Sequence, residues 1–401
     1  MVNIPNESIY LPMERQELKD YLILLEEREK FLVEQLCGSK YTRGSFEYKR
    51  YKTRRKIILT KFGKVDRHFV YVKHTLTGDI VSPLLVWLGI PKYQRLSVNF
   101  KQVLARKASR GTYQKGVEDI EDGFGFSIVR QTLHRYVKDT CSDLQIEQPP
   151  NPSHEVLLAD GTKVKSGSDE KHEVRTIISL GNATSEKALL REEINKSWSE
   201  LAEGMDFSQY RVFVGDGEPG LKEALCKEHM EFQYCHEHAK RDLAFFLWKD
   251  GLNKKKYIQY TQKFEEILHC LQNSTKKHAA DKDWQRLILR IQWAKKEINT
   301  LAMKINCRNL WEASSFLRRN KDYFTTAAEM AIIGVQVPWT TNSIERVMQE
   351  IGIRTKKKGM HWSENGLHRI LKMVLKRYFL PTNQRTYKEI FTSTQKEAVK
   401  S

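Results

Sequence analysis

The chain has 401 residues, which is enough for two or three domains with sizeable hydrophobic cores. Its 68 Lys and Arg against 50 Asp and Glu give a formal charge of +18, which predicts a polyanionic partner, nucleic acid before membrane. No signal peptide opens the chain, no apolar run could span a bilayer, and the six cysteines are scattered. We therefore expect a reduced, cytoplasmic protein with no membrane partner.

The positive charge is concentrated in two stretches. Residues 40–110 hold 18 Lys and Arg against three acids, and residues 351–401 hold 12 against three. The rest of the chain is mildly acidic. Two basic surfaces around an acidic middle indicate a DNA-binding module beside a carboxylate-lined metal site. A generally basic protein with a solvated surface is the alternative.

An amphipathic helix is predicted for residues 13–36, ending at Gly38. Its leucines recur at heptad-like spacing, interrupted by Glu29. Fewer than four heptads are present, so the seam fits either a short dimerising coiled coil or packing within its own domain. Residues 1–39 are therefore treated as a separate N-terminal segment.

A Tyr- and Arg-rich loop is predicted for residues 40–56, followed by two short strands around a turn that contains Gly63. Interleaved cations and aromatic rings suit phosphate contacts combined with base stacking, although a solvated charge run has the same composition. Arg50, Arg54 and Arg55 are the candidates for DNA contact in this loop.

A helix-turn-helix is predicted within the helical stretch 96–140, at about residues 113–140. A short helix, a glycine-containing turn and a second helix opened by Ser127 follow one another. Arg130, Gln131 and Arg135 lie on the polar side of the second helix, and Arg and Gln are the side chains that read guanine and adenine edges. Three-helix pieces also occur without DNA, but the neighbouring charge favours DNA binding for residues 40–147.

A proline-rich linker, residues 148–152, marks a predicted domain boundary. After it, strands alternate with helices. The strands are expected at 155–161, 174–180, 210–217 and 231–235, and the helices at 185–203, at 218–229 with Pro219 in the first turn, and from His236 onward. This alternation predicts a mixed α/β sheet across residues 153–240, with carboxylates at the strand ends.

The stretch 241–335 is almost wholly helical, which predicts an insertion whose tryptophans belong to its core. Residues 336–401 are expected to complete the sheet domain with a helix capped near Thr341 that carries Glu345 in its first turn, followed by a basic tail. The residues here that could grip a phosphate backbone are Arg346, Arg354, Lys356, Lys357 and Lys358.

Three acids are candidates for a metal centre. Asp160 and Asp216 each precede a glycine at a predicted strand end, and Glu345 lies where a helix dipole favours an anion. Such a triad binds two Mg²⁺ or Mn²⁺ ions about 4 Å apart, one activating a water or 3′-hydroxyl and one stabilising the leaving oxygen. Asp-Gly is also an ordinary turn, and Glu350 is a nearby rival for Glu345.

Four blocks of the sequence resemble the catalytic blocks of Mutator-type DDE transposases of prokaryotic insertion sequences. They are residues 159–162, 215–217, 234–238 and 341–346. This family has a ribonuclease-H-like core, a helical insertion before the last acid, and a Cys-x-x-His signature that Cys235 and His238 match. The resemblance covers roughly residues 56–380 and is specific because the blocks occur in this order.

The resemblance implies Asp160, Asp216 and Glu345 as the catalytic, metal-binding triad, with two Mg²⁺ or Mn²⁺ ions. It implies cleavage at the ends of a transposon followed by strand transfer. The expected partners are double-stranded DNA, as terminal inverted repeats and as target, and a second copy of the chain in a homodimer. A prokaryotic, nucleoid-associated location follows. The strands and the helix-turn-helix before the core resemble the end-binding region of the same group.

Cys235 and His238 are candidate accessory residues with two readings. Together with Cys226 and His229 they have zinc-ligand spacing. Cys226 and His229 would end a helix that packs on the sheet, so a structural zinc is the weaker reading. The stronger one packs Cys235 in a strand and places His238 near the metals or a DNA phosphate, with His236 as its rival.

Three functions stay open from the sequence. The first is a transposase that binds its element's inverted repeats and performs Mg²⁺-dependent cleavage and strand transfer. The second is a DNA-binding regulator with an inactive core, and the third is a ribonuclease-H-like nuclease or resolvase. The intact acids favour the first over the second, and the insertion with a separate binding region favours it over the third.

Overall fold

The computed structural model describes residues 11–38, 46–141, 144–149, 151–167, 171–181, 186–356 and 360–379. It divides into two units, one of Met1–Leu144 with Arg369–Ser401 and one of Gln145–His368. All six cysteines are free. Among the described residues, no helix combines the length and apolar character needed to cross a bilayer.

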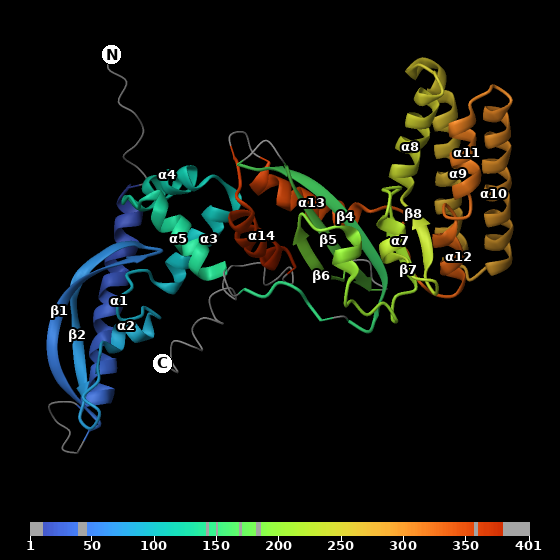
Figure 1. Cartoon of the computed structure of the whole chain (residues 1–401). Helices are drawn as coiled ribbons and strands as arrows, with labels where there is room; N and C mark the ends of the chain where they lie inside the picture. Colours follow the sequence, from blue (N-terminus) through green and yellow to red (C-terminus); the bar gives the residue numbers. More distant parts are fainter. Residues whose placement is uncertain are drawn as a thin grey trace, which may run out of the picture. The chain divides into compact units, whose positions relative to one another are not determined.

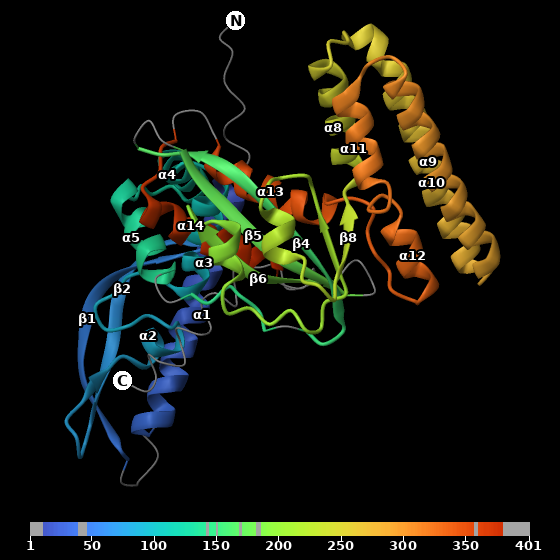
Figure 2. The ribbon, with the colours of Figure 1, turned by 45° about the vertical axis from the view of Figure 1, so that its right-hand side comes forward.

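In the first unit a long helix packs on a three-stranded antiparallel sheet (Figures 1 and 2). The elements are α1 (Leu11–Cys37), β1 (Tyr48–Thr60), β2 (Gly63–His74), β3 (Ile80–Val81) and the short α2 (Pro83–Trp87). Leu25 of α1 is buried with Ile58 and Phe69 of the sheet, and Leu18, Leu22 and Leu32 pack around them. The leucine seam therefore serves the core of its own unit, which is one of the two alternatives that the sequence left open.

The Tyr- and Arg-rich loop expected at residues 40–56 is wrong over its described part, because residues 48–56 belong to β1. Both faces of this half of the strand carry cations and rings, so no apolar alternation marks it in the sequence. Pairing with β2 makes this segment a strand: Arg54 lies opposite Phe69 and Lys56 opposite Arg67 in a long hairpin. Residues 39–45 lie outside the described residues.

Three mutually contacting helices complete the described part of this unit: α3 (Val98–Arg110), α4 (Tyr113–Phe124) and α5 (Arg130–Cys141). The hydroxyls of Ser97 and Thr112 cap α3 and α4. Gly125, with φ of 67°, ends α4 in the left-handed conformation. The second helix of the expected motif begins at Arg130, beyond Ser127, so Ser127 does not open it.

The second unit is built on a mixed five-stranded sheet, which agrees with the expected α/β class. The strands lie in the order β6 (Lys187–Ile194), β5 (Lys171–Gly181), β4 (His154–Lys165), β7 (Val212–Gly215) and β8 (Glu231–Tyr234). The pairs within β6-β5-β4 are antiparallel, and those within β4-β7-β8 are parallel. The helix α13 (Asn342–Thr355) packs on β4 (Figure 1).

The helix expected at residues 185–203 is mostly wrong, and the one expected at residues 218–229 is shorter than expected. The stretch 185–203 holds β6 and then only the short α6 (Trp198–Ala202), because pairing with β5 overrides the helix propensity of its Ala, Leu, Lys and Glu residues. The stretch 218–229 holds only α7 (Leu221–Leu225). Gly220, with φ of 80°, precedes this helix, so Pro219 lies before it and not in its first turn.

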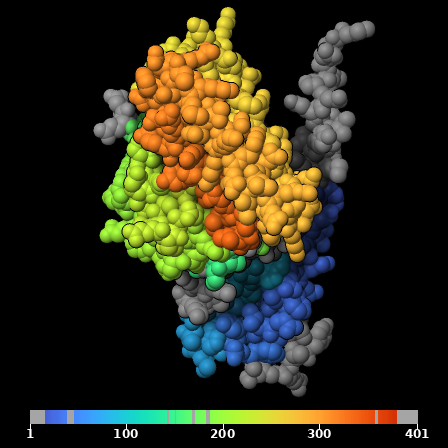
Figure 3. Space-filling view, turned by 90° about the vertical axis from the view of Figure 1, so that its right-hand side faces the viewer, coloured from blue at the N-terminus to red at the C-terminus, as the bar shows by residue number. Residues whose placement is uncertain are grey.

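The expected helical insertion lies between β8 and α13. It consists of α8 (His236–Lys249), α9 (Lys254–Ala280), α10 (Trp284–Asn306), α11 (Trp311–Asn320) and α12 (Thr326–Ile332). In the space-filling view its yellow and orange atoms form one continuous surface (Figure 3). Trp284 and Trp293 pack against its core as expected, whereas Trp248 and Trp311 are 62% and 60% exposed, contrary to expectation.

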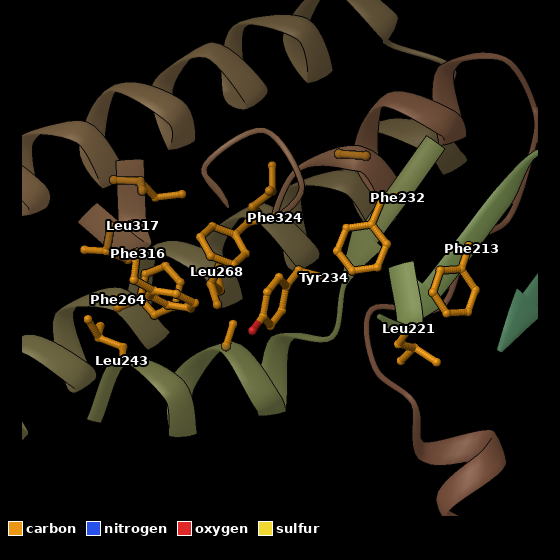
Figure 4. Packing of buried hydrophobic residues seen from close by; sticks show 14 of the residues in the cluster. Phe213, Leu221, Phe232, Tyr234, Leu243, Phe264, Leu268, Phe316, Leu317 and Phe324 are labelled. Carbon is orange, nitrogen blue, oxygen red and sulfur yellow. The ribbon is translucent and has the colours of Figure 1, made fainter. Parts of the chain in front are cut away.

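An aromatic core joins the insertion to the edge of the sheet. Figure 4 shows Phe232 and Tyr234 of β8 beside Phe316 and Phe324 of the insertion. The centroid of the Tyr234 ring lies 5.8 Å from that of Phe316 and 5.5 Å from that of Phe324. Such rings bury large areas with defined geometry, so they hold α11 and Phe324 against β8, directly before the start of α8. The same segment carries Cys235 and His238.

The helix α14 (Glu364–Phe379) crosses the division between the two units. Its acidic first residue and basic last turn suit the helix dipole. Residues 380–401 lie outside the described residues.

Candidate metal centre

Asp160 lies inside β4, not at the end of the strand as expected. The strand continues past it because β5 keeps pairing with β4 as far as Lys165. Only the pairing with β7 stops earlier, at Leu158 opposite Val214. Asp160 therefore lies just beyond the parallel part of the sheet, where β4 has lost one of its neighbours. Its Oδ1 accepts a hydrogen bond of 2.7 Å from the N–H of Gly161.

Asp216 directly follows β7, as expected. Its Oδ1 accepts a hydrogen bond of 3.0 Å from the N–H of Glu218, which fixes the turn. The next residue, Gly217, has no room for a side chain, because an added Cβ would overlap the hydroxyl of Tyr234. That hydroxyl donates a hydrogen bond of 2.6 Å to Oδ2 of Asp242 on α8. The turn that carries Asp216 is thus packed tightly against β8 and α8.

Glu345 lies in the first turn of α13, as expected. Ile344 and Val347 are buried on either side of it in the sequence, and α13 packs on β4. Thr341 occupies the capping position but makes no side-chain cap bond. Its hydroxyl instead lies 2.9 Å from Oε1 of Glu345 as a hydrogen-bond donor. The helix start therefore directs a carboxylate toward the strand that carries Asp160.

His236 and His238 have different environments. His236 is buried, its Nε2 donates to the carbonyl of Phe324 at 2.8 Å, and its Nδ1 accepts from Gln272 at 2.7 Å. Burial lowers the pKa of His236 to about 4, so it is a neutral core residue. His238, not His236, is the histidine that faces Asp216.

His238 links the three segments that carry the site. Its Nε2 lies 3.8 Å from Oδ2 of Asp216, and its Nδ1 lies 3.4 Å from Oγ1 of Thr341. The Sγ of Cys235 accepts a hydrogen bond of 3.3 Å from the N–H of Thr341, and the hydroxyl oxygen of Thr341 lies 3.3 Å from the same sulfur. A continuous series of contacts therefore runs from Asp216 through His238 and Thr341 to Glu345.

The Cys235–His238 pair has perturbed acid–base properties. Burial raises the pKa of the Cys235 thiol, but hydrogen bonds to His238 and Thr341 more than offset this, and the pKa lies below its usual value. Burial lowers the pKa of His238, and the contact with Cys235 and the charge of Asp216 more than offset it, so this pKa is raised. Both shifts favour the charged forms of the pair.

Asp160 feels the charges of both other acids. Its pKa is raised to about 6, first by burial and then by the negative charges of Asp216 and Glu345, while the Gly161 N–H and His238 act in the opposite direction. Carboxylates gathered in a partly buried place repel one another, and a divalent cation between them would offset that repulsion. Hard oxygen donors suit ions of the Mg²⁺ and Mn²⁺ class.

The four-residue zinc site considered from the sequence is not formed. Cys226 donates its S–H to the carbonyl of Met230 at 3.5 Å, and His229 lies 3.1 Å from the carbonyl of Phe207 through Nε2. Within the described ranges, the one group of His, Cys, Asp or Glu residues whose ligand atoms lie within 4.8 Å of one another consists of Cys235, His238 and Glu345. Asp160 and Asp216 lie outside this group.

One of the cationic candidates after Glu345 is buried. Arg354 is 1% exposed, with its guanidinium 4.6 Å from the ring centroid of Trp362 and its Nη1 3.2 Å from Sδ of Met360. It holds the end of α13 and cannot reach a phosphate backbone, so this expectation is corrected. Arg346 and Lys356 are exposed, and Lys357 and Lys358 lie outside the described residues.

The candidates in the first unit are all exposed. Arg50, Arg54 and Arg55 lie on β1, and Arg130, Gln131 and Arg135 lie on α5. Arg55 differs from its neighbours because it makes two hydrogen bonds, of 2.9 and 2.8 Å, to Asp66 across the hairpin. Its charge is therefore already compensated.

Sequence reasoning missed three residues beside the acids. Thr341 was expected only as a cap, and Tyr234 and Asp242 were not singled out. Asp242 has a raised pKa, first through burial, and it feels the charge of Asp216. A signal was available, since Asp242 lies one helical turn after His238 and the two therefore share a helix face.

The fold and the site together define a mixed α/β protein in which Cys235, His238 and Glu345 lie within ligand distance of one another and His238 lies beside Asp216. No family model matches the chain. It is 23% identical over 348 residues to the transposase for insertion sequence element IS905 of Lactococcus lactis subsp. lactis (strain IL1403). The alignment covers 82% of this chain and 79% of that protein. This similarity supports the expectation of a transposase of an insertion sequence.

The first prediction concerns the stability of the metal-free protein. Because the pKa of Asp160 is about 6 in the folded chain against 3.8 for an ordinary Asp, the folded state holds this proton longer, and stability falls as pH rises through that range. At pH 7 in EDTA, the free energy of unfolding of the variant Asp160→Asn should therefore exceed that of wild type by up to about 2–3 kcal/mol. The variant should unfold at a correspondingly higher temperature. The gain should vanish near pH 4. Equal melting temperatures at pH 7 would contradict it.

The second prediction concerns the turn after Asp216. Gly217→Ala should destabilise the protein by about 1–3 kcal/mol, because the new methyl group overlaps the Tyr234 hydroxyl. Tyr234→Phe removes that oxygen, so the double variant should lose less than the sum of the two single losses, measured by urea unfolding. Gly167→Ala, where an added Cβ meets nothing within 4 Å, is the control. Strictly additive losses would show that the overlap has no effect.

Proposed function

We propose that this protein is a Mutator-type DDE transposase that cuts and joins DNA at the ends of its insertion sequence. The observation that carries the proposal is the arrangement of β4, β7 and α13: β4 pairs with β7 up to Leu158 and α13 packs on β4, so three acids far apart in the sequence belong to neighbouring elements. The effect of Asp216 and Glu345 on the pKa of Asp160 agrees with this arrangement. The similarity to the IS905 transposase supports the same function independently of this geometry.

The arrangement of the second unit supports a ribonuclease-H-like core. Three antiparallel strands are followed by two parallel ones in the order β6-β5-β4-β7-β8. Asp160 belongs to the central strand and Asp216 to the end of its parallel neighbour. The insertion α8–α12 separates both from the helix that carries Glu345. This is the order of elements that the resemblance implies.

The chemistry follows from the roles of these side chains. Asp160, Asp216 and Glu345 hold two Mg²⁺ or Mn²⁺ ions, which when bound activate a water or a 3′-hydroxyl and stabilise the leaving oxygen. His238, within 3.8 Å of Asp216, orients that carboxylate and offers a positive charge beside a scissile phosphate. Thr341 fixes the orientation of Glu345 through the hydrogen bond to Oε1.

Double-stranded DNA, as element ends and as target, is the proposed partner, bound by a homodimer. In the first unit the contacts come from Arg50 and Arg54 on β1 and from α5 as the recognition helix of a helix-turn-helix, through Arg130, Gln131 and Arg135. In the second unit the exposed Arg346 follows Glu345 directly and Lys356 ends α13. These cations suit phosphates near the acids.

The third prediction tests the reaction. The full chain, a labelled duplex carrying the inverted repeat that borders its reading frame, and Mg²⁺ should yield nicked and joined products. Asp216→Asn should lower the rate by at least about a thousandfold, because the chemical step loses a metal ligand, while DNA binding is retained. Gel separation of the products measures nicking and joining, and a gel-shift assay with the same duplex measures DNA binding.

The other outcomes of this experiment separate the alternatives. Binding without any cleavage by the wild-type chain would identify a DNA-binding regulator with an inactive core. Cleavage without joined product would identify a nuclease or resolvase. Cleavage that survives in Asp216→Asn would remove the proposed triad.

The fourth prediction compares two neighbouring arginines of β1. Arg54→Ala should weaken DNA binding several-fold and reduce the slope of log affinity against log salt by about one, as expected for the loss of one phosphate contact. Arg55→Ala should have a smaller effect on affinity, because that guanidinium already pairs with Asp66. The comparison is matched, since each variant removes one exposed positive charge. Equal losses for the two variants would count against a phosphate contact at Arg54.

A further inference from the structure

We propose that Cys235, His238 and Glu345 form a binding site for a zinc-class divalent cation, separate from the site of the three acids but sharing Glu345 with it. A ligand atom from each of the three residues lies within 4.8 Å of the others. Cys235 occupies the N-cap position of α8, His238 lies in the first turn of the same helix, and Glu345 lies in the first turn of α13. Two segments more than 100 residues apart in the sequence thus converge on one point.

The hydroxyl of Thr341 lies beside all three ligands. Its Oγ1 lies 3.3 Å from Sγ of Cys235, 3.4 Å from Nδ1 of His238 and 2.9 Å from Oε1 of Glu345. In a tetrahedral zinc site the ligand atoms lie about 3.3–3.6 Å from one another, given metal–ligand distances of about 2.0–2.3 Å. The distances to Cys235 and His238 fall in this range, and the shorter one to Glu345 is that of a hydrogen bond. A cation bound to the three residues would therefore have this hydroxyl, or a water that displaces it, beside its fourth position.

The surroundings of the ligands suit a soft cation. The N–H of Thr341 donates to Sγ of Cys235, which stabilises a thiolate. With Nδ1 of His238 facing the cluster, Nε2 faces Oδ2 of Asp216 at 3.8 Å, and a carboxylate behind a ligating imidazole is the usual supporting arrangement in zinc sites. Sulfur and imidazole ligands select zinc, cobalt or cadmium over magnesium.

Sharing Glu345 makes the two sites compete for one carboxylate. A carboxylate drawn toward Cys235 and His238 binds an ion held by Asp160 and Asp216 less well. If the acids perform the proposed reaction, zinc would therefore inhibit it by drawing away one metal ligand. This consequence rests on the proposed function, whereas the binding of the cation itself does not.

The test uses Co²⁺ as a spectroscopic probe for zinc, added to the reduced full-length chain. We expect one equivalent to give a thiolate-to-cobalt charge-transfer band that zinc abolishes by competition. Cys235→Ser should remove the band, and Glu345→Gln should weaken Co²⁺ binding by more than about tenfold. Cys226→Ser is the matched control, because Cys226 also belongs to a Cys-x-x-His sequence but bonds to Met230. It should leave the band unchanged.

A band that persists in Cys235→Ser, or none in the wild type, would overturn the proposal. Cys235 is buried, so circular dichroism of each variant checks that it folds. His238→Gln provides a second position, 18% exposed, at which the band must fail. The band and Mg²⁺-dependent cleavage are separate readouts. Cleavage without the band overturns this inference alone, and the band without cleavage overturns the proposed function alone.

Discussion

The burial of Asp160 near the negative charges of Asp216 and Glu345 is the electrostatic constraint on which the candidate site depends. Burial and the two neighbouring carboxylates raise the pKa of Asp160 to about 6. The fold opposes this repulsion with fixed partners: the Gly161 N–H for Asp160, His238 for Asp216 and Thr341 for Glu345. A divalent cation bound between the carboxylates would offset the repulsion between their charges.

The rest of the unit holds these segments in register. The parallel pairing of β4, β7 and β8 aligns Asp160, Asp216 and the start of α8, and the aromatic core around Tyr234 and Phe324 anchors the insertion to β8. Burial of Ile344, Val347 and Ile351 fixes α13 and hence Glu345. A long insertion between the second and third acids is therefore compatible with an accurate site, because large buried contacts, not sequence proximity, set the geometry.

The sequence was sufficient for the α/β class, the helical insertion and the places of Asp216 and Glu345, because apolar periodicity, Asp-Gly turns and capping residues are local signals. It failed where tertiary pairing decides. Residues 187–194 have helical composition yet pair with β5, and residues 48–56 carry charge on both faces yet form a hairpin. The burial of Arg354 depends on Trp362, and the contacts of Thr341 depend on Cys235. No local pattern encodes such partners.

The central claim is that the three acids together hold divalent ions. Anomalous diffraction from crystals of the full chain soaked in Mn²⁺ tests it most directly. The account predicts anomalous peaks bounded by the carboxylates of Asp160, Asp216 and Glu345, two of them about 4 Å apart. Crystals in which Mn²⁺ gives no peak among these three residues, with Glu345 turned away from the two aspartates, would contradict it.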